Sequence, residues 1–333
     1  MKTVTLPSQP QTKEYHREHI PSGAVCALSL RTLTPVLLVA ALWSLPCRSH
    51  AQLYVSQEGA ARVGEYNAAT GTAINANLAS ASGTIWDIAV SGNNLYVSSG
   101  SLNKVGEYNA TTGAVINANF ITGLNNPWGV VISGNNLFVV NIGNGTVGEY
   151  DATTGAAINS VLVSGASVAE GGLALSGNDL FVGTFGKVGE YNATTGAAIN
   201  ANFITGVPGY YTDALAISGN DLFVAGSNSS NTGTVSEYDA TTGAAVNTSL
   251  VTGLTGANGV AVSGNTLFVA STGSGSGAVG EYNASTGAAI NANFISGLSV
   301  PSGLAIVPEP GSAALLTLGA GALIGWRRRR AAV

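Results

Sequence analysis

The chain has 333 residues, of which 45 are glycine, and its 12 basic and 17 acidic side chains give a formal net charge of −5. Between residues 52 and 310 only Arg62, Lys104 and Lys187 are basic, against 15 acidic side chains, so this part has a net charge of −12. Binding to nucleic acid or to an anionic membrane needs a basic surface. The composition therefore excludes nucleic acid as a partner of this part of the chain.

The first 51 residues have the pattern of an export signal. Arg31 precedes the apolar run from Leu33 to Leu45, and Ser49-His50-Ala51 has the small residues of a cleavage site. We expect signal peptidase to cut after Ala51. Both cysteines and all three histidines fall inside this segment. The exported part would therefore lack disulfides, thiol nucleophiles, imidazole bases and the usual zinc ligands.

The rest of the chain is built from a repeat that contains a Glu-Tyr pair. The pair occurs six times, at spacings of 42, 42, 41, 47 and 44 residues. A period of about 40–45 residues is the length of one four-stranded propeller blade. The pairs are Glu65-Tyr66, Glu107-Tyr108, Glu149-Tyr150, Glu190-Tyr191, Glu237-Tyr238 and Glu281-Tyr282.

One repeat predicts four strands in order. The continuous apolar run 128–132 suits an innermost strand, and a Ser-Gly-Asn-Asn turn separates it from a second strand at 137–140. A third strand follows at 146–150. The segment 73–78 alternates apolar and polar residues, which predicts a half-exposed outer strand.

Counting the hairpins of inner and second strands predicts the number of blades. Five hairpins are complete, and a sixth is split between residues 303–306 near the end and 53–55 near the start of the mature chain. Pairing these two segments would close the ring and leave no unpaired edge. We therefore predict an all-β, six-bladed β-propeller over residues 52–307, with one blade closed by strands from both ends.

The C-terminal tail, residues 308–333, has three parts in a fixed order. Pro308, Glu309 and Pro310 precede the apolar stretch 311–326, which is slightly shorter than the ~17–25 residues of a spanning helix. Four arginines follow, which would stay on the cytoplasmic side of a membrane. They are Arg327, Arg328, Arg329 and Arg330.

This tail resembles the PEP-CTERM sorting signal. The resemblance implies a protein of a Gram-negative-type bacterium that makes extracellular polysaccharide. It also implies that exosortase recognises the tail during a transient membrane contact, cuts near residues 308–310, and releases or attaches the body. An ordinary C-terminal membrane anchor is the alternative interpretation.

The unit PWGVVISGNNLFVVNIGNGTVGEYDATTGAAI resembles the NHL and YVTN propeller repeats. The resemblance extends over residues 52–307 and implies the propeller fold. It implies little about function, because such repeats occur in lyases, lactonases, oxidoreductases and interaction modules. The glutamate on the third strand departs from these families, which have an apolar or varied residue there.

Residues at the entries to the inner strands are the candidate site, because these entries should face the channel. Asp87, Glu170 and Asp213 are possible ligands of Ca²⁺, as in a lactonase-like metal-dependent hydrolase, or are loop acids that cap backbone amides. They stand at three different offsets from the inner strands. The nearby aromatic residues either stack on sugar rings, anchor a protein partner, or pack between blades. They are Trp86, Trp128, Tyr210 and Tyr211.

The repeated Glu-Tyr pair is predicted to be scaffolding. We expect the tyrosine to pack over the nearby glycine at the contact between blades, and the glutamate to accept hydrogen bonds from turn amides. A buried carboxylate without partners would be too costly to repeat in every blade.

These patterns favour an exported, non-catalytic propeller that needs no cofactor. It would be sorted across the inner membrane to the cell surface or extracellular matrix, with an extracellular polysaccharide or a surface protein as its partner. The competing hypothesis is the metal-dependent hydrolase centred on the three acidic residues.

Overall fold

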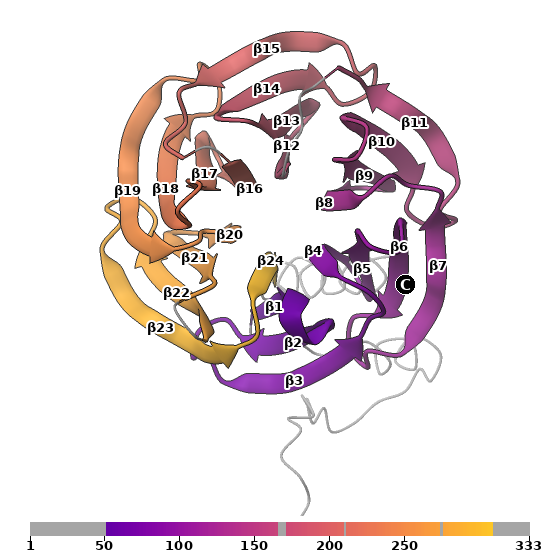
Figure 1. Ribbon diagram of the computed structural model, residues 1–333, viewed down its shortest axis with the longest axis horizontal. Helices are drawn as coiled ribbons and strands as arrows, with labels where there is room; N and C mark the ends of the chain where they lie inside the picture. The colour runs from indigo at the N-terminus through magenta and orange to yellow at the C-terminus, as the bar shows by residue number, and fades with distance from the viewer. Residues whose placement is uncertain (1–50, 166–170, 210, 274–275, 309–333) are drawn as a thin grey trace, which may run out of the picture. The chain divides into compact units, whose positions relative to one another are not determined.

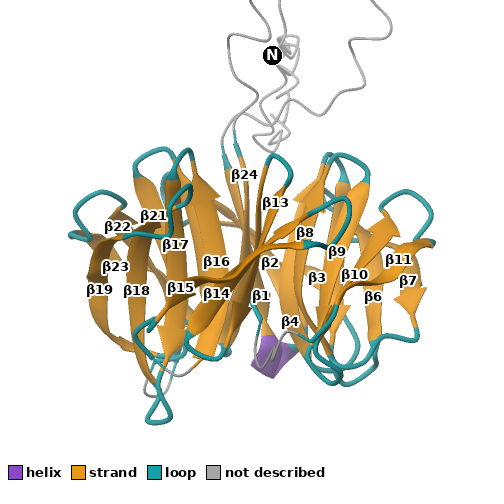
Figure 2. Cartoon of the chain, turned by 90° about the horizontal axis from the view of Figure 1, so that it is seen from above, coloured by secondary structure: helices purple, strands orange, loops and turns teal. Residues whose placement is uncertain are grey.

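The computed structural model describes residues 51–165, 171–209, 211–273 and 276–308. These residues form six four-stranded antiparallel sheets, arranged as blades around a central axis (Figure 1). The prediction of an all-β, six-bladed propeller is confirmed. Loops gather on two opposite faces of the disc (Figure 2).

Each blade has an inner, a second, a third and an outer strand. Blade 1 contains β24 (Pro301–Val307), β1 (Gln52–Gln57), β2 (Arg62–Asn67) and β3 (Ala73–Ser80). Blade 2 contains β4 (Ile85–Ser91), β5 (Asn94–Ser99), β6 (Lys104–Asn109) and β7 (Val115–Thr122). Blade 3 contains β8 (Pro127–Ser133), β9 (Asn136–Asn141), β10 (Thr146–Asp151) and β11 (Ala157–Val163).

The other three blades follow in chain order. Blade 4 contains β12 (Leu173–Ser176), β13 (Asp179–Thr184), β14 (Lys187–Asn192) and β15 (Ala198–Thr205). Blade 5 contains β16 (Tyr211–Ser218), β17 (Asp221–Ser227), β18 (Thr232–Asp239) and β19 (Ala245–Thr255). Blade 6 contains β20 (Gly259–Ser263), β21 (Thr266–Ser271), β22 (Gly277–Asn283) and β23 (Ala289–Leu298).

Blade 1 is closed by strands from both ends of the propeller. The register of β1 against β24 pairs Gln52 with Val307 and Leu53 with Ile306. The predicted split blade is therefore confirmed. A short 3-10 helix, η1 (Glu58–Ala60), links β1 to β2 on one face of the disc. The predicted export signal up to residue 50 and the tail from Glu309 onward lie outside the described residues.

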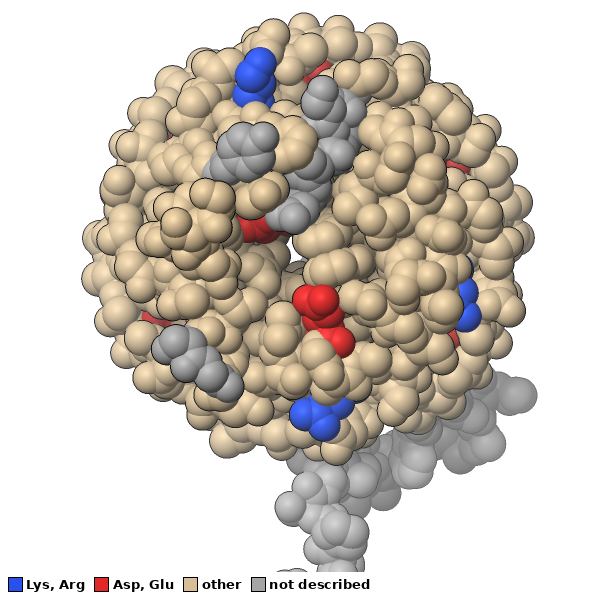
Figure 3. Space-filling view, viewed as in Figure 1, with Lys and Arg blue, Asp and Glu red and all other residues tan. Residues whose placement is uncertain are grey.

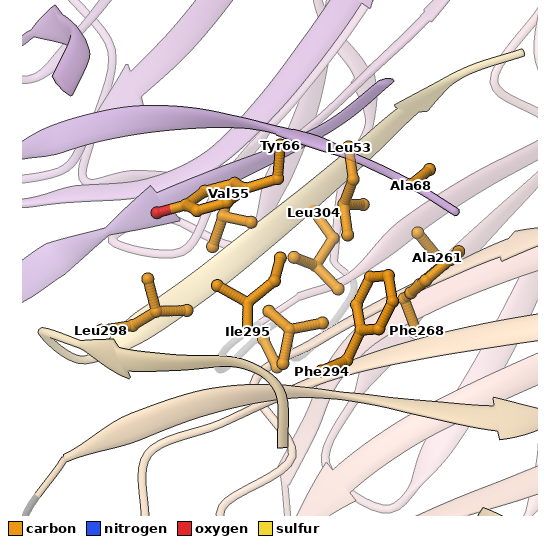
Figure 4. Packing of buried hydrophobic residues seen from close by; sticks show 12 residues of the cluster. Leu53, Val55, Tyr66, Ala68, Ala261, Phe268, Phe294, Ile295, Leu298 and Leu304 are labelled. Carbon is orange, nitrogen blue, oxygen red and sulfur yellow. The ribbon is translucent and has the colours of Figure 1, made fainter. Parts of the chain in front are cut away.

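The core is divided among the contacts between neighbouring blades. Six clusters of buried apolar side chains each combine residues of two adjacent blades. In the cluster of Figure 4, Phe268 and Phe294 of blade 6 pack with Leu53 and Tyr66 of blade 1. Because each blade buries its faces against two neighbours, the apolar burial is complete only when the ring is closed.

The outer strands differ from the predicted alternation of buried and exposed residues. In β3 both Ile74, which is 52% exposed, and its polar neighbours face solvent, whereas Leu78 and Ala79 are buried. The register passes from Glu65↔Asn75 to Val63↔Ala79, so β3 has two more residues than β2 at this point. Because of this bulge, buried and exposed residues do not alternate along β3. The strand also lies at the outer edge of its sheet.

Candidate functional site

Irregular pairing at the entries to three inner strands exposes side chains to the channel. The register against the second strand skips Trp86 and Asp87 in β4, Trp128 and Gly129 in β8, and Asp213 in β16. A β-bulge bends a strand and re-aims its side chains. Four residues of the predicted site therefore lie at bulges.

One position at each inner-strand entry differs from blade to blade. Alignment of the six inner strands places a different residue there in every blade except two, which both have tryptophan. From blade 1 to blade 6 the residues are Ser302, Trp86, Trp128, Gly171, Asp213 and Asn258. All of them except Gly171 line a pocket of about 360 Å³ at the channel mouth. We call these six residues the mouth ring.

Trp86 and Trp128 form a stacked pair in the mouth ring. Their ring centroids are 3.8 Å apart and their planes differ by 19°. The Ser56 hydroxyl donates to the Trp86 carbonyl at 2.8 Å, and the Ser98 hydroxyl donates to the Trp128 carbonyl at 2.6 Å. A Cβ added to Gly100 would lie 2.5 Å from Nε1 of Trp86, so this glycine leaves room for the indole. The preceding blade therefore fixes the backbone of each tryptophan.

The Asp87 carboxylate caps backbone amides. Oδ1 accepts from Ile88 N at 2.9 Å, and Oδ2 accepts from Val130 N of the next blade at 3.0 Å. Burial raises the pKa of Asp87 from 3.8 to about 6, although the two amide hydrogen bonds act in the opposite direction. This geometry corresponds to the capping interpretation of the acidic residues.

The other predicted residues lie on the opposite side of the mouth or outside the described chain. Asp213 is 7% exposed, and its Oδ2 accepts from the Ser227 hydroxyl at 2.7 Å. The Tyr211 ring lies 6.0 Å from that of Phe185 and lines the same pocket. Glu170 and Tyr210 are outside the described residues. Among the residues that the structure describes, no three His, Cys, Asp or Glu side chains form a group that could hold a metal ion.

A second cavity lies below the mouth pocket in the channel. It has a volume of about 230 Å³, and aliphatic side chains of the inner strands, among them Val130, Ile132 and Ile217, line it together with Asp87. Aliphatic side chains therefore predominate in the channel beneath a mouth that carries polar side chains. Figure 3 shows acidic side chains beside the central opening and the few basic side chains toward the rim.

Several residues of the mouth pocket were not predicted from the sequence. Asn228, Ser229 and Asn231 reach it from the loop between β17 and β18, and Ser227 and Ser302 lie at its wall. Ser302 could have been predicted by comparing the residues that the six inner strands have at the mouth-ring position. The loop residues have no counterpart in the repeat, so the period gives no indication of them.

The Glu-Tyr pair lies between blades, as predicted. Tyr150 belongs to a cluster with buried residues of blade 2, and its ring covers Gly148, where an added Cβ would lie 2.7 Å from the ring. The expected partner of the glutamate is wrong in blade 3. The Asn136 side-chain amide donates to Glu149 at 2.7 Å, whereas the turn amides donate to Asp151. Burial raises the pKa of Glu149.

The part of the chain that the structure describes contains no helix long and apolar enough to span a membrane. The apolar stretch 311–326 and the four C-terminal arginines lie outside that part.

Comparisons with known proteins give two family matches and a fold. The family model described as outer membrane protein assembly factor BamB matches residues 59–230, and that of the PEP-CTERM protein-sorting motif matches residues 307–330. The predicted sorting signal is thereby confirmed. No curated protein matches the chain.

A solved structure, titled "Crystal structure of Nidogen/Laminin Complex", is similar with a TM-score of 0.59 at 12% identity. The match covers 77% of this chain and 98% of that chain. At this identity the likeness shows the fold alone.

Proposed function

Because the chain belongs to the family described as outer membrane protein assembly factor BamB and carries a PEP-CTERM protein-sorting motif, we propose that it is an exported, non-catalytic binding propeller. The motif marks an exported protein that exosortase sorts. The body, residues 52–307, then acts at the cell surface or in the extracellular matrix. There it holds a partner through the mouth ring.

The contrast between the repeat and the mouth ring carries this proposal. The six blades repeat their third strands and turns almost unchanged, because these residues make the same contact between every pair of blades. The mouth ring instead combines two stacked indoles with a carboxylate, an amide and a hydroxyl around one pocket. A concave site with a few placed polar groups is typical of ligand binding.

The metal-dependent hydrolase is supported less well by the same geometry. Both carboxylate oxygens of Asp87 accept backbone amides, and Oδ2 of Asp213 accepts a serine hydroxyl. A metal would have to compete with these hydrogen bonds. A measurement of divalent metal in the purified protein, with and without Asp213→Ala, tests this alternative. Stoichiometric metal that is lost in the variant would favour the hydrolase.

The sorting part of the proposal is tested by cell fractionation. We expect the full-length chain to reach the surface or matrix, and a chain lacking residues 308–333 to miss that location. Equal delivery of both chains would contradict exosortase-dependent sorting.

The binding part is tested by retention in the matrix fraction. We expect full-length Trp128→Ala to be sorted normally and then shed into the medium, because the stacked pair is lost. Ile158→Ala is the matched control, since Ile158 lies on the outer strand of the same blade and is 53% exposed. Equal retention of the two variants would contradict binding at the mouth.

A further inference from the structure

We propose that the mouth pocket binds an uncharged sugar ring of a glycan, with the two indoles providing the stacking platform. This inference deepens the proposed function and rests on it. Three features of the pocket select this class of ligand: a flat apolar side, a polar side with donors and acceptors, and the sign of its charge.

The flat side of the pocket comes from blades 2 and 3. Trp86 and Trp128 are both partly exposed, and they line the pocket while stacked on each other. The Ser56 and Ser98 hydroxyls hold the backbone at the two tryptophans, and each indole packs against the other, so the aromatic surface is formed before any ligand arrives. A preorganised aromatic surface binds the C–H face of a saturated ring at a small entropic cost.

The polar side comes from blades 5, 6 and 1, which follow one another around the ring. Asn258 and Ser302 belong to the mouth ring, where the Ser302 hydroxyl donates to the Trp86 carbonyl at 2.6 Å, and Asn228 and Asn231 reach the pocket from the β17–β18 loop. The side-chain amides of the three asparagines both donate and accept hydrogen bonds, as the hydroxyls of a sugar do. The stacked indoles and these polar side chains lie on opposite arcs, with Tyr211 of blade 5 beside the polar ones, which matches a ring that has apolar faces and a polar circumference.

The charge of the pocket excludes acidic sugars from the proposal. Asp87 and Asp213 line it, and the described lining residues include neither lysine nor arginine. An anionic ligand such as a uronate would lie beside two carboxylates and lack a cationic partner.

The volume limits how much of a glycan enters. At about 360 Å³, the pocket is near the lower end of the 300–1,000 Å³ typical of small-molecule sites. It therefore suits a terminal ring or a side branch, and the rest of the glycan would extend across the face of the disc.

Tryptophan fluorescence gives a direct test, because Trp86 and Trp128 are two of only four tryptophans in the chain. In the full-length protein carrying Trp43→Phe and Trp326→Phe, the signal comes only from the mouth. The probes are short uncharged oligosaccharides of glucose, galactose and mannose. A galacturonate oligomer and an uncharged phenylalanine-containing peptide complete the set. We expect at least one uncharged sugar to change the emission saturably, and the galacturonate oligomer to be inactive.

Variants in the same background locate the effect. We expect Trp128→Ala to weaken binding by roughly tenfold, Trp128→Phe to weaken it less, and Ile158→Ala to leave it unchanged. The proposal is overturned if no uncharged sugar binds, if galacturonate binds equally well, if only the peptide binds, or if Trp128→Ala binds normally. Loss of matrix retention in Trp128→Ala without sugar binding would overturn this inference and leave the binding function intact.

Discussion

Asp87 occupies an inner-strand position at which four of the other five blades have glycine. The four are Gly129, Gly172, Gly259 and Gly303, and blade 5 has Ala214. The carboxylate fits there because it accepts amides from its own strand and from blade 3. A Cβ added to Gly303 of blade 1 would lie 2.3 Å from its Oδ1, so the closing blade packs directly against it. One side chain therefore joins three consecutive blades.

The raised pKa of Asp87 predicts a pH-dependent stability. Between 3.8, its ordinary value, and about 6, the folded chain retains a proton that the unfolded chain has released. The free energy of unfolding therefore falls as the pH rises through this window, by up to about 3 kcal/mol. We expect Asp87→Asn to flatten this part of the stability curve, measured by urea unfolding between pH 4 and pH 7.

Asp151→Asn is the control for this prediction. Hydrogen bonds from Thr154 and Thr153 lower the pKa of Asp151, so its ionisation favours the folded state and its contribution is lost as the pH falls. Four other blades have asparagine at this turn position, which makes the substitution compatible with the fold. A pH profile of Asp87→Asn that matches the unsubstituted protein would contradict the assignment.

At the scale of the element, the third strand fastens each blade to the one before it. We expect Tyr150→Ala to leave a cavity between blades 2 and 3 and to cost about 3–5 kcal/mol, as for other large buried aromatic residues. The melting temperature should fall by roughly 10 °C. Tyr150→Phe keeps the ring and should cost about 1 kcal/mol. Thermal unfolding measures both variants. Equal melting temperatures for the alanine variant and the unsubstituted protein would show that the Glu-Tyr pair does not hold neighbouring blades together.

The strands also show how far the sequence predicts this structure. The inner and third strands follow directly from apolar runs and the repeat. The alternation of apolar and polar residues in β3 wrongly predicts that every second side chain is buried. The hydrophobic pattern does not reveal that β3 has two extra residues opposite β2. Of the predicted site, Trp86, Asp87, Trp128, Tyr211 and Asp213 do line one pocket. The capping role of Asp87 depends on an amide of the neighbouring blade, which no local pattern indicates.

At the scale of the molecule, closure depends on one strand that the chain adds last. β24 pairs with β1 along its length, and the Ser302 hydroxyl lies 2.9 Å from that of Ser56. It also supplies Leu304 to the contact with blade 6. Without β24, the inner edge of β1 would be unpaired and the channel wall would be open, which favours pairing with another chain.

Two truncations separate the role of this strand from that of the tail. A chain that ends at Val300 lacks β24, whereas a chain that ends at Pro308 keeps every described strand. We expect the shorter chain to melt at least about 10 °C lower and to self-associate, measured by thermal unfolding and size-exclusion chromatography. The chain that ends at Pro308 should melt like the full-length protein and should not self-associate. If the two truncated chains behaved alike, the split blade would not be what holds the ring closed, and the other five blade contacts would suffice.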